Sequence, residues 1–523
     1  MESKSNVERT ARRARPIRWW SAGVIVALGI GAVAWTWMDP TRSHQQRNLT
    51  LLAVLLGSVP LLLVWWGVLS GASERARRGG VAACLALLAL AGSMLRVTGV
   101  SGDLLPIFEF RWKSSPAPLV PLTAATSTAS TPGLASTLVS AFPQFLGPNR
   151  DGVIRGIRLA PDWSTNGPVE VWRHPVGAAW SGFAVVDGIA YTQEQAEGDE
   201  LVTAYDLLSG KRLWEHRDAG RYSNTIAGEG PRSTPTVDGD RVYTLGATGT
   251  LNCLDRKSGS RIWGLSLTKI AACGVPEWGF TSAPLIAGGR VIVLAGGTSA
   301  VWAFNAEDGN LAWSSVSHGA NYGAVSLLDL AGQRQLVHFG SRSVVGLDPA
   351  DGRERWKHPF GTGMPLVAQP VVIGTNRLVV SAGYGVGAEL IEIGASNAVR
   401  SVWTTKRLKA KFANPVRIGD MIVGLDDGIL AAIELKDGNQ LWKEGRHGHG
   451  QGLLVGDLLL LMAESGEILL LQPKPDGPHE LARLRVFDAK TWNPIALAGD
   501  LLLVRNDREA ACLRLPLASV PAQ

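Results

Sequence analysis

Residues 205–214, Tyr-Asp-Leu-Leu-Ser-Gly-Lys-Arg-Leu-Trp, form a motif that returns along the chain. A Gly and a Trp stand at the same relative positions in four further segments, which begin at Leu254, Phe304, Leu347 and Ile433. An Asp or Asn near the start of such a motif bonds the backbone that follows it, and the Gly adopts a left-handed conformation that other residues resist. The motif therefore predicts a tight turn that leads into a strand ending in Trp.

Seven tryptophans mark this repeat, because two degenerate copies end in Trp as well. Successive members are 39 to 50 residues apart, and the set consists of Trp172, Trp214, Trp263, Trp313, Trp356, Trp403 and Trp442. A large aromatic side chain that returns at a regular interval is expected in the core. We interpret these tryptophans as structural docking residues.

A second motif alternates with the first and consists of an apolar strand, a Gly turn and another apolar strand, as in residues 235–243. It occurs eight times, and two hairpins per unit give four strands, which is the blade of a β-propeller. The last unit lacks its Trp strand, whereas the strand 169–172 has no blade before it. We expect this early strand to complete the last blade. The predicted fold is an all-β, eight-bladed propeller over residues 169–515, closed without a free edge.

The segment Ala204-Tyr-Asp-Leu-Leu-Ser-Gly-Lys-Arg-Leu-Trp214 resembles the tryptophan-docking repeat of the pyrroloquinoline-quinone (PQQ) propeller superfamily. That superfamily includes quinoprotein alcohol dehydrogenases and the non-enzymatic outer-membrane protein assembly factor BamB. Residues 142–152, Phe-Pro-Gln-Phe-Leu-Gly-Pro-Asn-Arg-Asp-Gly, also resemble the opening of membrane- or envelope-associated PQQ-like proteins. The resemblance covers residues 142–515 and implies that the tryptophans pack between blades. It implies a scaffold that binds envelope proteins, or alternatively a PQQ-dependent membrane dehydrogenase for alcohols or sugars.

The enzyme alternative requires basic residues for the three carboxylates of PQQ, oxygen ligands for Ca²⁺, and an Asp base. Many such enzymes also carry a disulfide between adjacent cysteines, whereas Cys84, Cys253, Cys273 and Cys512 are scattered. We interpret residues 426–427, Asp-Asp, as a hairpin turn, and the pair His447 and His449 as part of a loop without further zinc ligands. We therefore predict no catalytic residue, no metal site and no bound cofactor, with PQQ and Ca²⁺ as the alternative.

One set of positions, directly before the innermost strands, suggests a ligand site at a channel mouth. Alignment of the blades places eight residues there: Phe183, Thr234, Ala283, Asn321, Gln369, Asn414, Gln451 and Asn493. Six are polar, and Arg232 and Lys411 lie near them in sequence. They form either a polar ring that binds a peptide or small polar ligand, as in a ligand sensor, or amides that bond neighbouring blades beside a water-filled channel.

Residues 19–112 are predicted to be a membrane anchor with spans at about 19–38, 49–72 and 81–100. If the third span continues past residue 95, Arg96 could extend its charge to the membrane surface. Residues 1–18 form a cytoplasmic tail with six basic residues, and the loop at 75–78 contains three more. The positive-inside rule then places the propeller on the periplasmic side of the inner membrane. A third run that failed to span would leave the propeller in the cytoplasm.

Composition supports a folded membrane protein. The 523 residues are 46% hydrophobic and only 18% charged, with 61 Gly and 19 Trp, which excludes a disordered chain and a coiled coil. The net charge of +6 is concentrated in the N-terminal tail, and no basic stripe suggests nucleic-acid binding. Residues 113–141, rich in Ser, Thr, Ala and Pro, are a predicted linker, 142–168 lead into the propeller, and 516–523 form a tail.

Overall fold

The computed structural model describes residues 17–39, 42–112 and 141–518. Two units are present, one up to Ser115 and one from Pro116 onward, and each is described by itself. Most of the predicted N-terminal tail, nearly all of the predicted linker and the last five residues lie outside the described residues.

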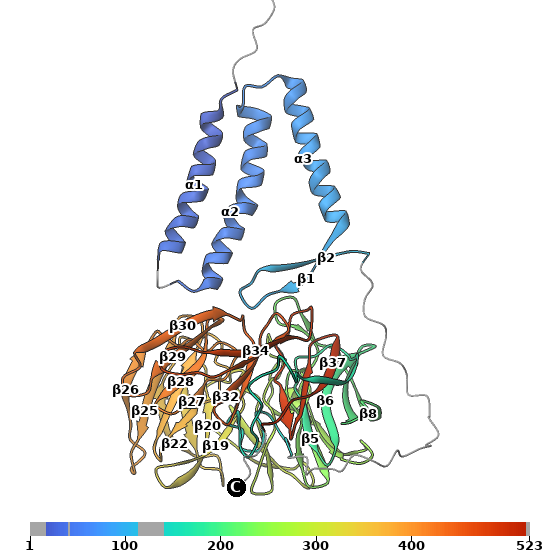
Figure 1. Ribbon diagram of the computed structural model, residues 1–523, viewed down its shortest axis with the longest axis vertical. Coiled ribbons are helices and arrows are strands. Elements are labelled where there is room, and N and C mark those ends of the chain that lie inside the picture. Colours follow the sequence, from blue (N-terminus) through green and yellow to red (C-terminus); the bar gives the residue numbers. More distant parts are fainter. Residues whose placement is uncertain (1–16, 40–41, 113–140, 519–523) are drawn as a thin grey trace, which may run out of the picture. The chain divides into compact units, whose positions relative to one another are not determined.

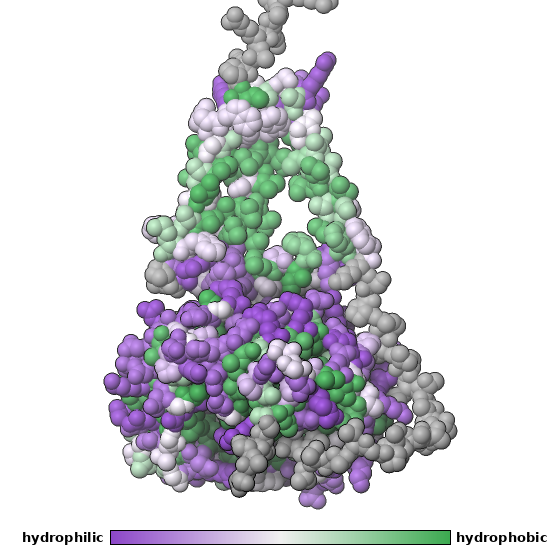
Figure 2. All heavy atoms as spheres, viewed as in Figure 1, coloured by the Kyte–Doolittle hydropathy of each residue, from purple (hydrophilic) through white to green (hydrophobic). Residues whose placement is uncertain are grey.

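The first unit contains three helices that are long and apolar enough to cross a membrane (Figure 1). They are α1 (Trp19–Met38), α2 (His44–Val64), which continues as the π-helical turn η1 (Trp65–Leu69), and α3 (Glu74–Met94). Apolar side chains cover most of their surface (Figure 2). Ser43 begins α2 with a capping box, because its hydroxyl accepts from Gln46 N while the Gln46 side chain accepts from Ser43 N. The second predicted span therefore starts earlier, at residue 44, and ends at 69.

The third predicted span, 81–100, is wrong at both ends. Helix α3 begins at Glu74 behind the N-cap Ser73 and ends at Met94. Residues Leu95–Val100 form the strand β1, which pairs antiparallel with β2 (Pro106–Phe110). The β-branched and Gly residues at 97–100 favour an extended backbone over a further helical turn. Arg96 consequently lies in a hairpin, where it faces Glu109 at 3.5 Å.

The second unit is an eight-bladed propeller of four-stranded antiparallel blades, as predicted. Blade 1 consists of β5 (Ala184–Val186), β6 (Ile189–Ala196), β7 (Asp199–Asp206) and β8 (Arg212–Ala219). Blade 2 consists of β11 (Thr236–Asp238), β12 (Arg241–Leu245), β13 (Thr250–Asp255) and β14 (Arg261–Ser266). Blade 3 consists of β15 (Leu285–Ala287), β16 (Arg290–Leu294), β17 (Val301–Asn305) and β18 (Leu311–Ser314). Blade 4 consists of β19 (Ser326–Leu330), β20 (Gln333–Phe339), β21 (Ser343–Leu347) and β22 (Glu354–Pro359).

The second half of the ring repeats this order. Blade 5 consists of β23 (Val371–Ile373), β24 (Arg377–Ala382), β25 (Gly387–Ile393) and β26 (Val399–Thr405). Blade 6 consists of β27 (Val416–Ile418), β28 (Met421–Asp426), β29 (Ile429–Glu434) and β30 (Gln440–Arg446). Blade 7 consists of β31 (Gln451–Val455), β32 (Leu458–Met462), β33 (Glu467–Leu471) and β34 (Glu480–Arg485), with β3 (Val153–Ile154) added parallel to β31. The short elements β9 (Ser223–Asn224), β10 (Gly228–Glu229) and α4 (Leu267–Ile270) lie in connecting loops.

The ring closes as the sequence predicts. Blade 8 consists of β35 (Ala496–Ala498), β36 (Leu501–Arg505), β37 (Glu509–Arg514) and, from the start of the propeller, β4 (Val169–Pro175). In this pairing Trp172 lies opposite Cys512. The buried Arg505 adds a second link between the last and first blades, since its guanidinium donates to Thr192 Oγ1 at 2.9 Å and to the Gly177 carbonyl at 2.7 Å.

Between blades, five repeat tryptophans lie against the turn glycine of the next blade. A Cβ atom on each glycine would come within 2.4–2.8 Å of the ring, in the pairs Trp172/Gly210, Trp214/Gly259, Trp263/Gly309, Trp313/Gly352 and Trp403/Gly438. The indole N–H of Trp214, for example, donates to the Arg256 carbonyl in the next turn at 3.0 Å. Trp356 departs from this pattern and donates to Gln335 of its own blade at 2.6 Å. Trp442 donates to the Lys474 carbonyl of the next blade at 2.7 Å.

Candidate functional site

The two faces of the propeller differ in which loops form them. Loops that lead into the innermost strands form one face, which we call the aromatic face: residues 176–183, 220–235, 267–284, 315–325, 360–370, 406–415, 447–450 and 486–495. The Gly turns of the tryptophan motif form the opposite face, because strands of a four-stranded antiparallel blade alternate in direction.

The first part of the lead-in segment, residues 142–154, lies inside the ring, where it bonds the innermost strands. Phe142 exchanges backbone hydrogen bonds of 2.9 and 2.8 Å with Val185 of blade 1. Val237 N of blade 2 donates to the Pro143 carbonyl at 2.8 Å, and β3 pairs with β31 of blade 7. The segment thus bonds innermost strands on separate sides of the ring.

Arg150 extends these contacts to blades 3 and 4. Its guanidinium donates to the carbonyls of Ala283 at 3.1 Å, Pro284 at 3.0 Å and Val325 at 3.4 Å. Complete burial lowers the pKa of Arg150 to about 10. A buried cation is tolerated when it is hydrogen-bonded, so these carbonyls account for its position.

The predicted polar ring lies at the mouth of this space on the aromatic face, and its members bond adjacent blades. Asn493 of blade 8 donates to the Ser181 carbonyl before blade 1 at 2.8 Å. Asn414 accepts from the backbone N–H of Gln369, one blade earlier, at 2.8 Å. Gln451 donates to the Phe412 carbonyl at 2.9 Å.

The remaining ring members follow the same pattern. The Thr234 hydroxyl accepts from Gly182 N of the preceding blade at 3.2 Å. Asn321 accepts from Leu366 N, ahead of blade 5, at 2.6 Å. Phe183 and Ala283 are buried apolar members. These contacts correspond to the structural alternative, in which the amides bond neighbouring blades.

The two basic residues expected near the ring lie against aromatic faces. The Arg232 guanidinium is 4.4 Å from the Tyr222 ring centroid and donates to the Ala227 carbonyl at 2.6 Å. Desolvation lowers the pKa of Arg232 to about 10. Lys411 is buried, with Nζ 4.9 Å from the ring centroid of Tyr384. Neither cation projects freely into solvent.

An aromatic cluster, which sequence reasoning missed, lies on the same face; its members are Trp180, Trp278, Tyr322, Phe412 and Trp492. The Phe412 ring is 5.8 Å from both Trp278 and Trp492, which precede blades 3 and 8. We call this cluster the aromatic cap. A sequence signal was present, because each member lies within five residues of a ring position.

Lys490 completes the cap. Its Nζ lies 4.0 Å from the ring centroid of Trp492 and 4.8 Å from that of Trp180, and burial lowers the pKa of this lysine. A cation over an indole face is attracted by the ring quadrupole. The cap therefore combines aromatic rings with a cation that lies over two of them.

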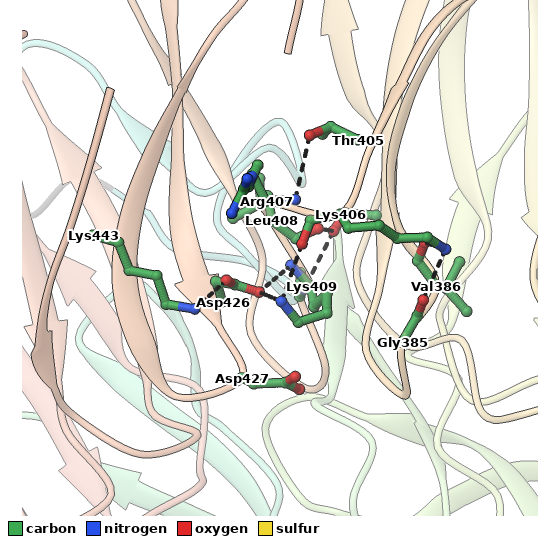
Figure 3. Close-up of polar contacts among 12 residues, drawn as sticks. Gly385, Val386, Thr405, Lys406, Arg407, Leu408, Lys409, Asp426, Asp427 and Lys443 are labelled. Carbon is green, nitrogen blue, oxygen red and sulfur yellow. Dashed lines mark hydrogen bonds and ion pairs between the residues drawn. The ribbon is translucent and has the colours of Figure 1, made fainter. Parts of the chain in front are cut away.

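A basic loop at 406–411 borders the cap and is fixed by blades 5 and 6. Figure 3 shows Asp426 between Lys409 and Lys443, with Lys409 Nζ 2.5 Å from the carboxylate. Lys406 Nζ donates to two carbonyls in the β24–β25 turn at 2.8 and 2.7 Å. The exposed Arg407 lies between these fixed lysines.

The residues on this face do not fit PQQ with Ca²⁺. The cations that would hold its carboxylates cover aromatic faces or bond backbone carbonyls. Asp427 and Asp507 are carboxylates near the cap, and burial raises the pKa of both, which weakens them as cation ligands. Among residues 17–39, 42–112 and 141–518, no three His, Cys, Asp or Glu side chains gather as a metal site would require.

Comparisons with known proteins agree with the repeat. Residues 198–444 match the family model described as outer membrane protein assembly factor BamB. The outer membrane protein assembly factor BamB of Yersinia pestis is 24% identical over 254 residues, which are 46% of this chain and 63% of that relative. This chain thus spans less than two thirds of that relative's length.

A second relative represents the enzymes. The quinohemoprotein alcohol dehydrogenase ADH IIB of Pseudomonas putida is 32% identical over 134 residues, 24% of this chain and 18% of that enzyme. Among solved structures, BamB from Moraxella catarrhalis superposes with a TM-score of 0.51 at 16% identity, covering 68% of this chain and 99% of that one. At this identity the likeness concerns the fold alone.

Proposed function

We propose that this chain is a membrane-tethered scaffold whose propeller binds envelope proteins through loops of the aromatic face. The observation that carries the proposal is that residues 142–154 bond the innermost strands from within the ring while the aromatic cap joins loops that precede separate blades. The surrounding loops then remain as the binding surface. Similarity to outer membrane protein assembly factors supports a protein partner.

These loops expose apolar side chains on four consecutive connections. We call the set the apolar arc: Ile226, Val275, Val316 and Met364. Exposed Lys406 and Arg407 follow on the next connection. Protein interfaces commonly combine an apolar centre with a polar or charged rim. The arc and the basic loop have this composition.

We further propose that the propeller lies on the periplasmic side of the inner membrane. If all three candidate spans cross the bilayer, the two ends of the anchor lie on opposite sides. Arg75, Arg77 and Arg78 lie in the first turns of α3, against Arg42 before α2 and Arg47 in the first turn of α2. The positive-inside rule assigns the more basic side to the cytoplasm.

Site-specific photo-cross-linking in intact cells tests the binding surface. A photoreactive residue at Val316, which is 65% exposed, should form adducts with one discrete partner. The control is Leu208, 55% exposed on the opposite face, which should form none. Equal adducts at both positions, or none at Val316, would count against the aromatic face as the binding surface.

A quinoprotein dehydrogenase is the second candidate, because the Pseudomonas putida enzyme is the most identical relative named above. Purified chain is incubated with PQQ and Ca²⁺ and assayed for the spectrum of bound cofactor and for dye-linked oxidation of alcohols or sugars. We expect neither. Stoichiometric binding with turnover would replace the scaffold proposal. A small-molecule sensor receives no comparable support, since the polar ring is engaged between blades.

A further inference from the structure

The hairpin β1–β2 has one apolar and one charged face. Val97, Phe108 and Phe110 are 55%, 59% and 49% exposed, and Val97 pairs directly with Phe108. Trp112, 64% exposed, stacks on Phe110 with ring centroids 4.7 Å apart. Arg96 and Glu109 pair at 3.5 Å on the other face, because successive side chains of a strand point to opposite sides.

The hairpin is fixed to the ends of two helices. The Arg111 guanidinium donates to the carbonyls of Gly92 at 3.2 Å and Leu95 at 3.1 Å, and so covers the free carbonyls at the C-terminus of α3. At the hairpin's turn, the Asn48 side chain in the first turns of α2 donates to the Asp103 carbonyl at 3.0 Å. The hairpin therefore runs from the end of α3 to the start of α2 (Figure 1).

No linker separates this hairpin from the candidate span, since β1 begins at the residue after Met94. If α3 crosses the bilayer, the hairpin lies at the level of the lipid headgroups. The exposed Trp35 and Trp37 near the C-terminus of α1 belong to the same end of the anchor, because α1 ends at Met38 and α2, whose Asn48 contacts the hairpin, begins at His44. Aromatic rings are enriched at that depth in membrane proteins.

We propose that the apolar face of the β1–β2 hairpin, formed by Val97, Phe108, Phe110 and Trp112, inserts into the headgroup region of the bilayer. The inference rests on the proposed membrane anchor. Bilayer lipid is the occupant because the chain holds the hairpin at the bilayer surface, and because its charged face is turned away from the apolar one. The hairpin would fix the depth and tilt of α3, as interfacial anchors do.

A diazirine-bearing phenylalanine at Phe108 tests this in the full chain, reconstituted in nanodiscs of phosphatidylethanolamine and phosphatidylglycerol. Mass spectrometry identifies the adducts after irradiation. We expect a several-fold excess of lipid adducts at Phe108 over the same probe at Ile107, which lies on the opposite face of β2. Adducts to propeller peptides, or no excess over Ile107, would overturn the inference.

The same probe at a third position distinguishes a hairpin that does not contact lipid from an anchor that does not cross the membrane. Leu87 is 67% exposed in the middle of α3. Lipid adducts at Leu87 without an excess at Phe108 reject the hairpin inference alone. Absence of lipid adducts at Leu87 rejects the membrane anchor of the proposed function, and the hairpin inference with it.

Discussion

His338 in β20 is fully buried at a position where blades 3 and 5 carry aliphatic side chains. It follows Val337, which pairs with Ser326 of the innermost strand; Val293 and Val380 occupy the corresponding sites in blades 3 and 5. Burial lowers the pKa of the imidazole to about 4, from an ordinary 6.5. The folded propeller therefore holds this histidine neutral at mildly acidic pH.

His338→Leu should remove an acid sensitivity of the propeller. Below pH 6.5 the unfolded chain binds a proton that the folded chain does not bind until about pH 4, so stability falls as pH drops through this window. Over the whole window the free energy of unfolding falls by about 3 kcal/mol, at 1.36 kcal/mol per pKa unit. Chemical denaturation of the detergent-solubilised chain at pH 7 and pH 5 measures it. The variant should lose less stability between pH 7 and pH 5 than the parent.

Substitution of two glycines in blade 2 distinguishes the stability cost of displacing a docking tryptophan from the cost of backbone strain alone. Gly259 and Gly239 both have positive φ, +71° and +57°, but a Cβ on Gly259 would lie 2.4 Å from Trp214, whereas Gly239 faces open space. Gly239→Ala should cost about 1 kcal/mol, the penalty of a left-handed Ala. Gly259→Ala should cost roughly 1–3 kcal/mol more, because the ring must move. Equal free energies of unfolding for the two variants would show that the ring does not depend on this turn.

At the residue scale, sequence alignment located the ring positions but not their partners. Asn414 could be placed before an innermost strand from the repeat alone. Its bond to Gln369 N depends on the spacing between two blades, which no local pattern encodes. The aromatic residues of the cap lie near ring positions in sequence, but their contacts could not be predicted, since Phe412, Trp278 and Trp492 are far apart in sequence and meet only once the ring is closed.

At the scale of elements, closure was predictable because strands could be counted. A last unit with one strand missing and a first strand without a blade leave one economical pairing, which β4 and β37 make. The lead-in segment was not predictable in this way. It has no repeat. Its hydrogen bonds to blades 1, 2 and 7 are mostly made by backbone atoms, so they cannot be predicted from the pattern of side chains.

Arg150→Ala should destabilise the propeller through this segment. The substitution removes the Arg150 donor from the carbonyls of Ala283 and Val325 and removes a buried side chain, at a cost of about 3 kcal/mol; the Pro284 carbonyl still accepts from the Thr236 hydroxyl. Arg155→Ala is the matched control, because Arg155 pairs with Asp151 on the surface at 2.8 Å and should contribute under ~1 kcal/mol. Denaturant unfolding of both variants compares them. A small loss for Arg150→Ala would mean that the segment is held by its backbone alone.

For the whole molecule, hydropathy predicted three spans but misplaced the third. A run of apolar residues shows that a segment can be buried in lipid, but it does not show where the helix ends and the hairpin begins. The Ser73 cap and the Arg111 contacts to the last carbonyls set the true limits of α3 at Glu74 and Met94. The charges near the ends of the helices are visible in the sequence alone, and the proposed orientation of the anchor in the membrane rests on them.

Topology reporters test that orientation over the full chain. A reporter active only in the periplasm is fused after residues 42, 78 and 130. The more basic α2–α3 connection should face the cytoplasm, so the fusions at 42 and 130 should be active and the fusion at 78 silent. Activity at 42 alone would mean that α3 does not cross the membrane and that the propeller is cytoplasmic. The propeller could then not bind envelope proteins. Activity at 78 alone would mean that the anchor is inverted, because all three connections exchange sides together.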